Sequence, residues 1–276
     1  MKITNKYNLP SSFIHAENAK EYTKGDADYS VTGLLRPPQV SKLFGRHYEE
    51  IEIDITETIF SMIGTALHAY LQKSDVSAQT EERYYANIDG VVISGQIDRL
   101  VNRNGKYIIQ DYKLVMTWEH IRGVKEEKIA QMNLYAELLR QNYIDVDGAE
   151  LVFIFRDWTK SKTKYDERYP ESPVNVFDVE LWSREKCVDY IRERVDAHRS
   201  GGECSDVDRW AQPDTWAVQK PNASKAYRVC KSEQEANEKL KAGMEIVFRP
   251  GRNRRCDDYC AVNRFCQQYQ GLKREA

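Results

Sequence analysis

The stretch GQIDRLVNRNGKYIIQDYKL, residues 95–114, has the pattern of two β-strands joined by a tight turn. The turn is Asn104-Gly105, a pair that readily adopts the positive φ angles of a two-residue hairpin. Each strand is mainly apolar but carries an aspartate, Asp98 in the first and Asp111 in the second. A carboxylate inside a strand is costly unless its charge is compensated, and a second carboxylate nearby adds repulsion. The pattern therefore predicts a compensating positive charge at this pair of strands.

A divalent cation would compensate both aspartates. Hard oxygen ligands suit Mg²⁺ or Mn²⁺, which retain bound water, and such a water can attack phosphorus in phosphodiester hydrolysis. Lys113 projects from the same strand face as Asp111, because side chains alternate along a strand. Its ammonium can orient the water or stabilise the charge that develops on phosphate. Tyr112 points to the other face, so its backbone carbonyl is available as a further metal ligand.

The elements around this hairpin follow from hydrophobic periodicity. Apolar residues at helical spacing predict an amphipathic helix from Thr56 to about Gln72, with His68 near its end, and a second helix over about residues 125–141. A further turn at Asp89-Gly90 adds a third strand to the hairpin. The predicted strands cover residues 80–88, 90–101, 106–114 and 149–158. The predicted order is helix, three-stranded antiparallel meander, helix, strand.

The rest of the chain has weaker signals. Residues 1–50 are predicted to be irregular, and a further strand is expected over 173–182. Ser183 is a candidate cap for a helix that ends at about His198. After Gly201-Gly202 the composition changes to short charged segments with tryptophan and cysteine, so we expect domains at 1–50, 51–200 and 201–276.

Composition sets broad limits. The chain has 276 residues, of which 41% are hydrophobic and 30% are charged, so it can bury a core of ordinary size. No segment approaches the ~20 apolar residues of a membrane span, and MKITNKYNLPSSF has no signal-peptide pattern, so a cytoplasmic location and no membrane partner are expected. A net charge of −2 neither supports nor excludes DNA binding. Because no Walker-type phosphate loop is present, a helicase would be a separate partner.

The order of these motifs resembles the PD-(D/E)XK nuclease superfamily, in its RecB-like branch, which includes CRISPR-associated adaptation nucleases and phage exonucleases. The matching segments, in the family's order, are GTALHAY with His68, EERYY with Glu82, SGQIDRL with Asp98, QDYK with Asp111 and Lys113, and QMNLY with Gln131 and Tyr135. The resemblance covers roughly residues 55–200 and implies an α/β fold with a restriction-endonuclease-like core. One departure is Asp111, since glutamate is common at that position in the family.

The resemblance also implies a role for each matched residue. The metal would be held by His68, Asp98, Asp111 and the Tyr112 carbonyl, and Lys113 would be catalytic. Gln131 and Tyr135 would form the branch's Gln-x-x-x-Tyr motif near bound DNA, and Glu82 would be a further acidic residue of the site.

Several of these residues have ordinary structural explanations. Glu81 is adjacent to Glu82, and either carboxylate could face the site. His68 is also consistent with a partly buried structural histidine. Gln131 and Tyr135 lie four residues apart on one helical face, which suits either a paired site or a core tyrosine beside a surface glutamine.

The cysteines indicate a second site. All six follow residue 186, and three of them form the motif Cys256-x3-Cys260-x5-Cys266. In a reducing compartment such a cluster is more typical of a metal site than of disulfides, and it needs a fourth ligand. The candidates are Cys204, Cys230 and Cys187, and we favour Cys204 because it opens the C-terminal segment in a loop.

Relatives in the RecB-like branch often hold a 4Fe-4S cluster with one upstream cysteine and three C-terminal ones, commonly spaced Cys-x2-Cys-x5-Cys. The present motif differs from that spacing by one residue. Zinc is an alternative, because four thiolates also suit its tetrahedral geometry. Three free cysteines in a small core are the structural alternative.

Basic segments favour DNA as the partner. One group is Arg249, Arg252, Arg254, Arg255 and Arg264, and another is Arg156, Lys160, Lys162 and Lys164, with Trp158, Tyr165 and Tyr169 available for base stacking. The favoured hypothesis is a Mg²⁺- or Mn²⁺-dependent deoxyribonuclease, with exonuclease action in phage or mobile-element recombination or in DNA repair as the preferred form, and with a separate helicase or recombination protein as a candidate partner. The alternative is a non-catalytic nucleic-acid-binding or assembly module that keeps the fold. A site-specific restriction enzyme shares the site chemistry but matches the motifs less well.

Overall fold

A computed structural model describes residues 1–20, 24–74 and 78–275 and divides the chain into two compact units. The first, here called the sheet unit, comprises Lys2–Arg36 and Glu52–Ser200. The second, here called the cysteine unit, comprises Met1, Pro37–Ile51 and Gly201–Ala276. The residues before the predicted core are therefore shared between the two units.

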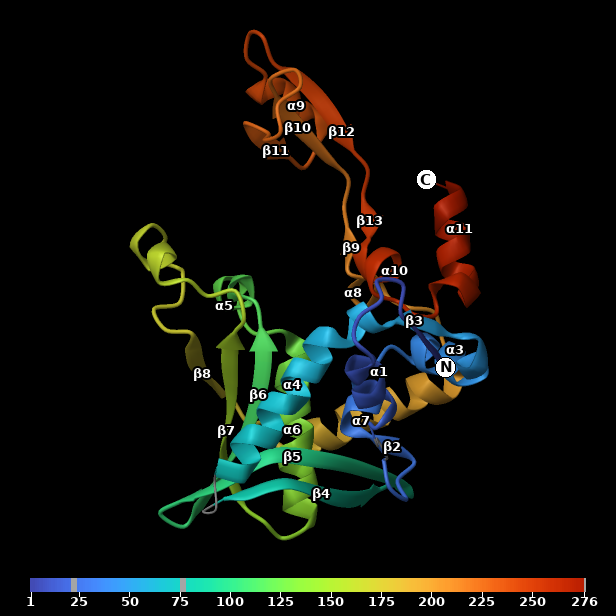
Figure 1. Cartoon of the computed structure of the whole chain (residues 1–276), viewed down its shortest axis with the longest axis vertical. Coiled ribbons are helices and arrows are strands. Elements are labelled where there is room, and N and C mark those ends of the chain that lie inside the picture. The colour runs from blue at the N-terminus through green and yellow to red at the C-terminus, as the bar shows by residue number, and fades with distance from the viewer. Residues whose placement is uncertain (21–23, 75–77, 276) are drawn as a thin grey trace. The chain divides into compact units, whose positions relative to one another are not determined.

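The sheet unit is built on a mixed β-sheet with the strand order β2-β5-β6-β7-β8 and with β4 paired to the other edge of β5 (Figure 1). The strands are β2 (Tyr29–Ser30), β4 (Gln79–Ile88), β5 (Val91–Arg103), β6 (Lys106–Val115), β7 (Val146–Phe155) and β8 (Val174–Val179). Strands β4, β5 and β6 form the antiparallel meander, and β7 pairs with β6 in parallel. The predicted restriction-endonuclease-like order of elements is confirmed.

Both tight turns have the backbone that their sequences predict. Asp89 and Gly90 have φ of 52° and 82°, and Asn104 and Gly105 have φ of 58° and 85°. In each turn the glycine N–H donates to an asparagine side chain three residues earlier, Asn87 at 2.9 Å and Asn102 at 2.8 Å. These turns fix the register of the meander.

Helices cover the two faces of the sheet. The long helix α4 (Ile55–Ser74) crosses one face and α6 (Glu126–Gln141) lies against the other (Figure 1). Lys128 of α6 lies over Phe153 of β7, whereas the guanidinium of Arg156, the residue after β7, lies over Phe60 of α4. Buried side chains of α6, including Met132, Leu134 and Leu138, form the core with the strands.

Among the described residues, the sheet unit has seven further elements, most of them short. They are β1 (Lys2–Thr4), α1 (Ser11–Asn18), α2 (Val31–Leu35), β3 (Glu52–Asp54), α5 (Thr117–Arg122), η2 (Lys160–Lys164) and α7 (Arg184–Ser200). The prediction that residues 1–50 are irregular is wrong. Ser30 caps α2 by accepting a hydrogen bond from the Gly33 N–H at 3.0 Å, and Val31, Leu34 and Leu35 are buried. Helices of five to nine residues are too short to show a clear hydrophobic period.

The cysteine unit joins a helix from the first part of the chain to the C-terminal segment. Its elements are α3 (Pro38–Arg46), η1 (Tyr48–Glu50), α8 (Asp206–Arg209), β9 (Ala211–Gln212), β10 (Thr215–Gln219), β11 (Arg228–Cys230), α9 (Glu233–Lys239), β12 (Glu245–Arg249), β13 (Arg252–Asn253), α10 (Arg254–Asp258), η3 (Asn263–Phe265) and α11 (Gln267–Glu275). Strands β9 and β13 form a ribbon that leads to the small sheet β11-β10-β12 (Figure 1). Among the described residues, no helix is long and apolar enough to cross a membrane.

Candidate active site

The two aspartates lie where strands β5 and β6 separate. Their ladder runs from the turn only as far as the pair Arg99 and Gln110, whereas β6 continues beside β7 to Val115. Past this point the Asp98 side chain replaces the missing ladder bond, because its Oδ2 accepts a hydrogen bond from the Tyr112 N–H at 2.8 Å. Beyond Arg99 and Gln110 the two strands diverge at what is here called the fork, and polar side chains occupy the space between them.

Three potential metal ligands meet at this fork. One side-chain ligand atom each from His68, Glu81 and Asp98 lies within 4.8 Å of the others. His68 Nδ1 lies 3.5 Å from Asp98 Oδ2 and 3.6 Å from Glu81 Oε1. These two carboxylates, Asp98 more than Glu81, raise the pKa of His68 from 6.5 to about 10, so the imidazole is protonated in the metal-free protein.

The backbone fixes the orientation of His68. Its Nε2–H donates to the Tyr112 carbonyl at 3.0 Å, which leaves Nδ1 directed at the two carboxylates. Metal-bound histidines commonly donate their second ring N–H to such a carbonyl. In this structure the Tyr112 carbonyl accepts a hydrogen bond from His68 and so orients the imidazole. A direct bond from this carbonyl to a metal ion stays a prediction.

Asp111 and Lys113 form a buried ion pair beside this cluster. Lys113 Nζ lies 2.6 Å from Asp111 Oδ2, and Asp111 is only 1% exposed. Burial, with a contribution from the Asp98 charge, raises the pKa of Asp111 to about 6 despite the opposing attraction of Lys113. Burial alone would lower the pKa of Lys113, but Asp111 and Asp98 outweigh it and the net shift is upward.

The donor set suits a hard divalent cation. Carboxylate oxygens and one imidazole nitrogen are available at the fork, and Asp111 Oδ1 is buried without a hydrogen-bond donor, whereas Oδ2 is paired with Lys113. Unsatisfied buried carboxylate oxygens are costly, and a cation would satisfy them. The residues present therefore fit a site for an ion such as Mg²⁺ or Mn²⁺.

Glu81, and not Glu82, is the further acidic residue that the structure brings to the fork. Glu82 accepts a hydrogen bond from the Tyr84 hydroxyl at 2.8 Å, away from the cluster. Glu81 has φ of 55°, a left-handed conformation that is strained for a residue with a side chain. The choice of Glu82 is corrected accordingly.

Gln96 is a positioning residue that the sequence did not reveal. Its Nε2 donates to Glu81 Oε2 at 2.8 Å and to the Glu81 carbonyl at 3.2 Å. Its Oε1 accepts from Arg83 at 2.9 Å, so the amide is held from both sides. Gln96 thereby fixes the strained segment that presents the Glu81 carboxylate.

Gln131 and Tyr135 form a pair on α6. The Gln131 amide donates to the Tyr135 hydroxyl at 2.9 Å, and both residues are buried, with Gln131 8% exposed. A surface glutamine beside a core tyrosine is therefore not the arrangement found. The tyrosine ring lies directly against Gly95 of β5.

Gly95 allows this close approach of helix and strand. A Cβ atom at Gly95 would lie 2.6 Å from Leu138 Cδ1 and 2.9 Å from two Tyr135 ring atoms. We expect Gly95→Ala to lower the free energy of unfolding by about 1–3 kcal/mol, because the core must shift to admit the methyl group. Urea denaturation checks this value.

Gly64→Ala is the matched control, because a Cβ there meets no atom within 4 Å. In the interior of α4 this change should stabilise the protein by about 0.5–1 kcal/mol. Equal effects of the two substitutions would contradict the close packing at Gly95.

A groove leads to the fork. It has a volume of about 1040 Å³ and is lined by α1, by the α4 face from Phe60 to Gln72, and by Glu81, Gln96 and Lys113. His68 also lines it, so the side chains of His68 and Glu81 are reachable from the groove.

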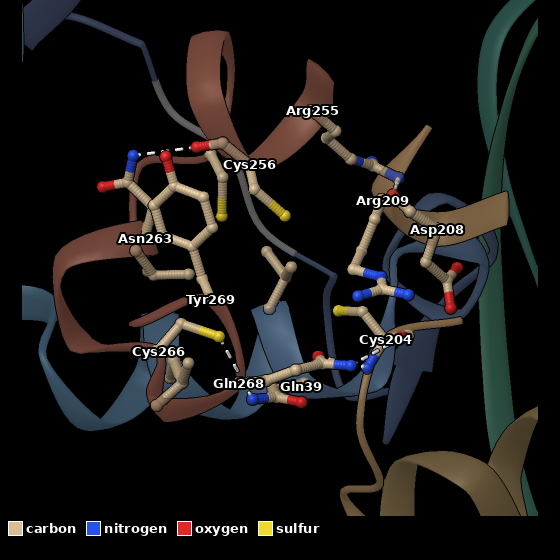
Figure 2. A pocket seen from close by; sticks show the side chains of 14 residues that line it. Gln39, Cys204, Asp208, Arg209, Arg255, Cys256, Asn263, Cys266, Gln268 and Tyr269 are labelled. Atoms are coloured by element: carbon tan, nitrogen blue, oxygen red, sulfur yellow. Dashed lines mark hydrogen bonds between the residues drawn. The ribbon is translucent and has the colours of Figure 1, made fainter. Parts of the chain in front are cut away.

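Four cysteines line one enclosed cavity in the cysteine unit. They are Cys204, Cys256, Cys260 and Cys266, and Figure 2 shows Cys204, Cys256 and Cys266 at different walls of this cavity. Burial is the main cause that raises the pKa of Cys204 to about 12 and that of Cys256 to about 11. Cys187 and Cys230 lie elsewhere. Cys230 belongs to a separate apolar cluster with Val218 and Ala236, and the Cys187 thiol donates to the Asn133 carbonyl of α6 at 3.6 Å.

The sulfur spacing bears on which metal fits. Tetrahedral zinc with Zn–S bonds of about 2.3 Å brings its sulfurs to about 3.8 Å from one another. Among the described residues, no three cysteine sulfurs lie within 4.8 Å of one another. Gln39 of α3 also faces the cavity and donates to Cys266 Sγ at 3.3 Å.

Comparisons with known proteins place the chain in a family. The sequence profile of the PD-(D/E)XK nuclease superfamily matches residues 39–267. The fold is similar to the crystal structure of SSO0001, with 18% identity and a TM-score of 0.47 over 67% of this chain and 82% of that one. It is also similar to a phage-related exonuclease from Haemophilus somnus, with 16% identity and a TM-score of 0.33 over 62% of this chain and 79% of that one.

No curated protein sequence matches the chain significantly. The profile match covers well over half of the chain and includes the fork residues His68, Asp98, Asp111 and Lys113. The chain therefore belongs to the PD-(D/E)XK nuclease superfamily.

Proposed function

We propose that the chain is a divalent-metal-dependent deoxyribonuclease that hydrolyses phosphodiester bonds. The observation that carries the proposal is the buried pair of Asp111 and Lys113 next to the cluster of His68, Glu81 and Asp98. Three of these residues, His68, Glu81 and Lys113, line one groove. A purely structural role would not require two buried or half-buried carboxylates beside a third, because their mutual repulsion destabilises the fold.

The cation would be held by Asp98, Asp111, Glu81 and His68 Nδ1, with the Tyr112 carbonyl as a further candidate ligand. When bound, such an ion supplies Lewis acidity toward a phosphate oxygen and a water of lowered pKa. Mg²⁺ and Mn²⁺ are the favoured ions because most of these donors are hard oxygens.

Lys113 would act on the substrate. An ammonium has three N–H donors, and the ion pair with Asp111 engages one side of it. The remaining donors can orient the attacking water and stabilise negative charge on a non-bridging phosphate oxygen. Gln131 and Tyr135 would support the bound strand from α6.

Exonuclease action, in phage or mobile-element recombination or in DNA repair, is our proposal from the resemblance to the RecB-like branch. A separate helicase or recombination protein would then supply or process the DNA ends. The alternative is a binding or assembly module without catalysis, and the intact Asp111–Lys113 pair argues against it.

End-labelled single- and double-stranded DNA, incubated with anaerobically purified protein, tests the proposal. We expect degradation with Mn²⁺ or Mg²⁺ and none with EDTA, and the labelled products give the polarity. Retarded DNA without cleavage on any substrate would favour the binding module.

We further propose that Cys204, Cys256, Cys260 and Cys266 hold a 4Fe-4S cluster, with structural zinc as the alternative. Four thiols around one enclosed cavity support the proposal, because four cysteine thiolates are the usual ligands of a 4Fe-4S cluster, and they also suit zinc. Its role would be to hold α3 and the C-terminal helices together, since the cavity is lined by both.

Metal analysis of the anaerobically purified protein checks this assignment. We expect about four iron atoms per chain, with a large loss in Cys204→Ser or Cys256→Ser. Cys187→Ser and Cys230→Ser are matched controls and should keep the iron, because these thiols lie outside the cavity. Zinc in place of iron would favour the structural zinc site. A wild-type protein that contains neither iron nor zinc would show four free cysteines.

A further inference from the structure

The loop between β7 and β8 carries a run of basic residues. Lys160, Lys162 and Lys164 occupy the short helix η2, and Arg156 begins the loop. In the part of the chain that the structure describes, none of the three lysines forms an ion pair with an acid. This turn therefore presents three ammonium groups to solvent without a direct ion-pair partner.

The base of the loop is rigid. Trp158 Nε1 donates to the Pro170 carbonyl at 2.8 Å, which ties the two arms together. The Tyr169 hydroxyl accepts from the Thr159 N–H at 2.9 Å and donates to the Asp157 carbonyl at 3.3 Å. These bonds hold the loop as a projection at the end of β7 (Figure 1).

The same bonds correct the prediction of stacking residues. Tyr169 is buried, and Trp158 packs against the core of the sheet unit, so neither ring is available to a base. Tyr165 is the exception, because it is 86% exposed and directly follows Lys164. An exposed ring beside a row of ammonium groups matches the composition of single-strand binding sites.

Arg156 connects this loop to the groove of the active site. Its guanidinium carbon lies 3.6 Å from the centre of the Phe60 ring, and Phe60 lines the groove. The backbone N–H of Arg156 donates to the carbonyl of Val115 at 3.0 Å, and Val115 lies two residues beyond Lys113. The stacked guanidinium thus holds a fixed positive charge at the edge of the groove.

We propose that Arg156, the three lysines of η2 and Tyr165 form a binding track for single-stranded DNA that leads to the groove. The lysines and Arg156 contact successive phosphates, and Tyr165 stacks on an unpaired base. Duplex DNA offers the same phosphates but no free base face to Tyr165. The direction of the track rests on the proposed nuclease site, whereas the binding itself does not.

Fluorescence anisotropy with a labelled single-stranded oligonucleotide in EDTA tests the track without cleavage. We expect a triple variant, Lys160→Gln, Lys162→Gln and Lys164→Gln, to reduce the slope of log affinity against log salt by about 2, at about 0.7 per phosphate contact. Tyr165→Ala should weaken binding by about 5-fold or more, because it removes one stacked base. Tyr165→Phe should bind like the wild type.

Tyr143→Ala is the matched control. Tyr143 is 99% exposed and precedes β7, at the strand end opposite the loop, so its loss should leave the affinity unchanged. An unchanged salt slope in the triple variant, or equal affinities of Tyr165→Ala and Tyr143→Ala, would overturn the track. An equal loss for duplex DNA would overturn its single-strand preference. Because no divalent ion is present, these outcomes are independent of whether the protein cleaves DNA.

Discussion

We expect Lys113→Ala to reduce the rate of the proposed DNA cleavage by about 100- to 1,000-fold, because it removes one donor to the transition-state charge. The substitution deletes the ammonium that lies 2.6 Å from Asp111 Oδ2 and faces the groove. Binding of DNA in EDTA should remain, because the side chain is one contact among many to phosphate. Single-turnover cleavage of end-labelled DNA at saturating Mg²⁺ measures the effect on the chemical step.

The same variant has a second readout in stability. Without Lys113 the buried Asp111 carboxylate loses its nearest positive charge, so its pKa rises further and the metal-free protein is destabilised. A bound divalent ion replaces that charge, and we expect Mg²⁺ to raise the melting temperature of Lys113→Ala more than that of the wild type.

Lys106→Ala serves as the control for both readouts. Lys106 is the first residue of the same strand, at the end beside the Asn104-Gly105 turn, and its ion pair with Asp147 is exposed. Cleavage should continue at the wild-type rate in this variant. Wild-type cleavage by Lys113→Ala itself would remove Lys113 from the proposed mechanism.

The meander could be predicted because its turns are encoded locally. Asp89-Gly90 and Asn104-Gly105 each require two successive positive φ angles, which few other residue pairs accept. The position of the first turn also identifies Glu81, and not Glu82, as the acid at the fork. Counting back from the two-residue turn at Asp89-Gly90 places Glu81 opposite Asp98, because the flanking pairs join Thr80 to Arg99 and Glu82 to Ile97.

Other parts of the site depend on tertiary contacts. The left-handed conformation of Glu81 is maintained by Gln96 and Arg83, and no local pattern signals such a strained residue. The short helices α2 and α3 have the same origin, since burial against other elements stabilises them more than intrinsic propensity does. Three of the cavity cysteines were grouped by their spacing in the sequence. The fourth, Cys204, lies 52 residues before Cys256, and only its position at the start of the C-terminal segment favoured it over Cys230 and Cys187.

Metal affinity should depend steeply on pH, because His68 must lose a proton to offer Nδ1 to a cation. Asp98 and Glu81 raise the pKa of His68 to about 10 in the metal-free protein, so the imidazole is charged at neutral pH. The upward shift stabilises the metal-free fold below the unfolded-state value near 6.5, and this contribution is lost as the pH rises toward 10. A cation therefore displaces one proton from His68 throughout the neutral range.

Below about pH 6 a cation would also displace a proton from Asp111, since burial raises the pKa of this carboxyl to about 6. We expect the affinity for Mg²⁺ to rise about tenfold per pH unit between pH 7 and 9, and more steeply below pH 6. Calorimetric titrations in two buffers of different ionisation enthalpy count the released protons directly. His68→Asn should abolish the dependence above pH 7, whereas His15→Asn, at an exposed position on α1, should keep it. A Mg²⁺ affinity that is flat from pH 7 to 9 in the wild type would show that the ion does not displace the His68 proton, and Nδ1 would then be excluded as a ligand.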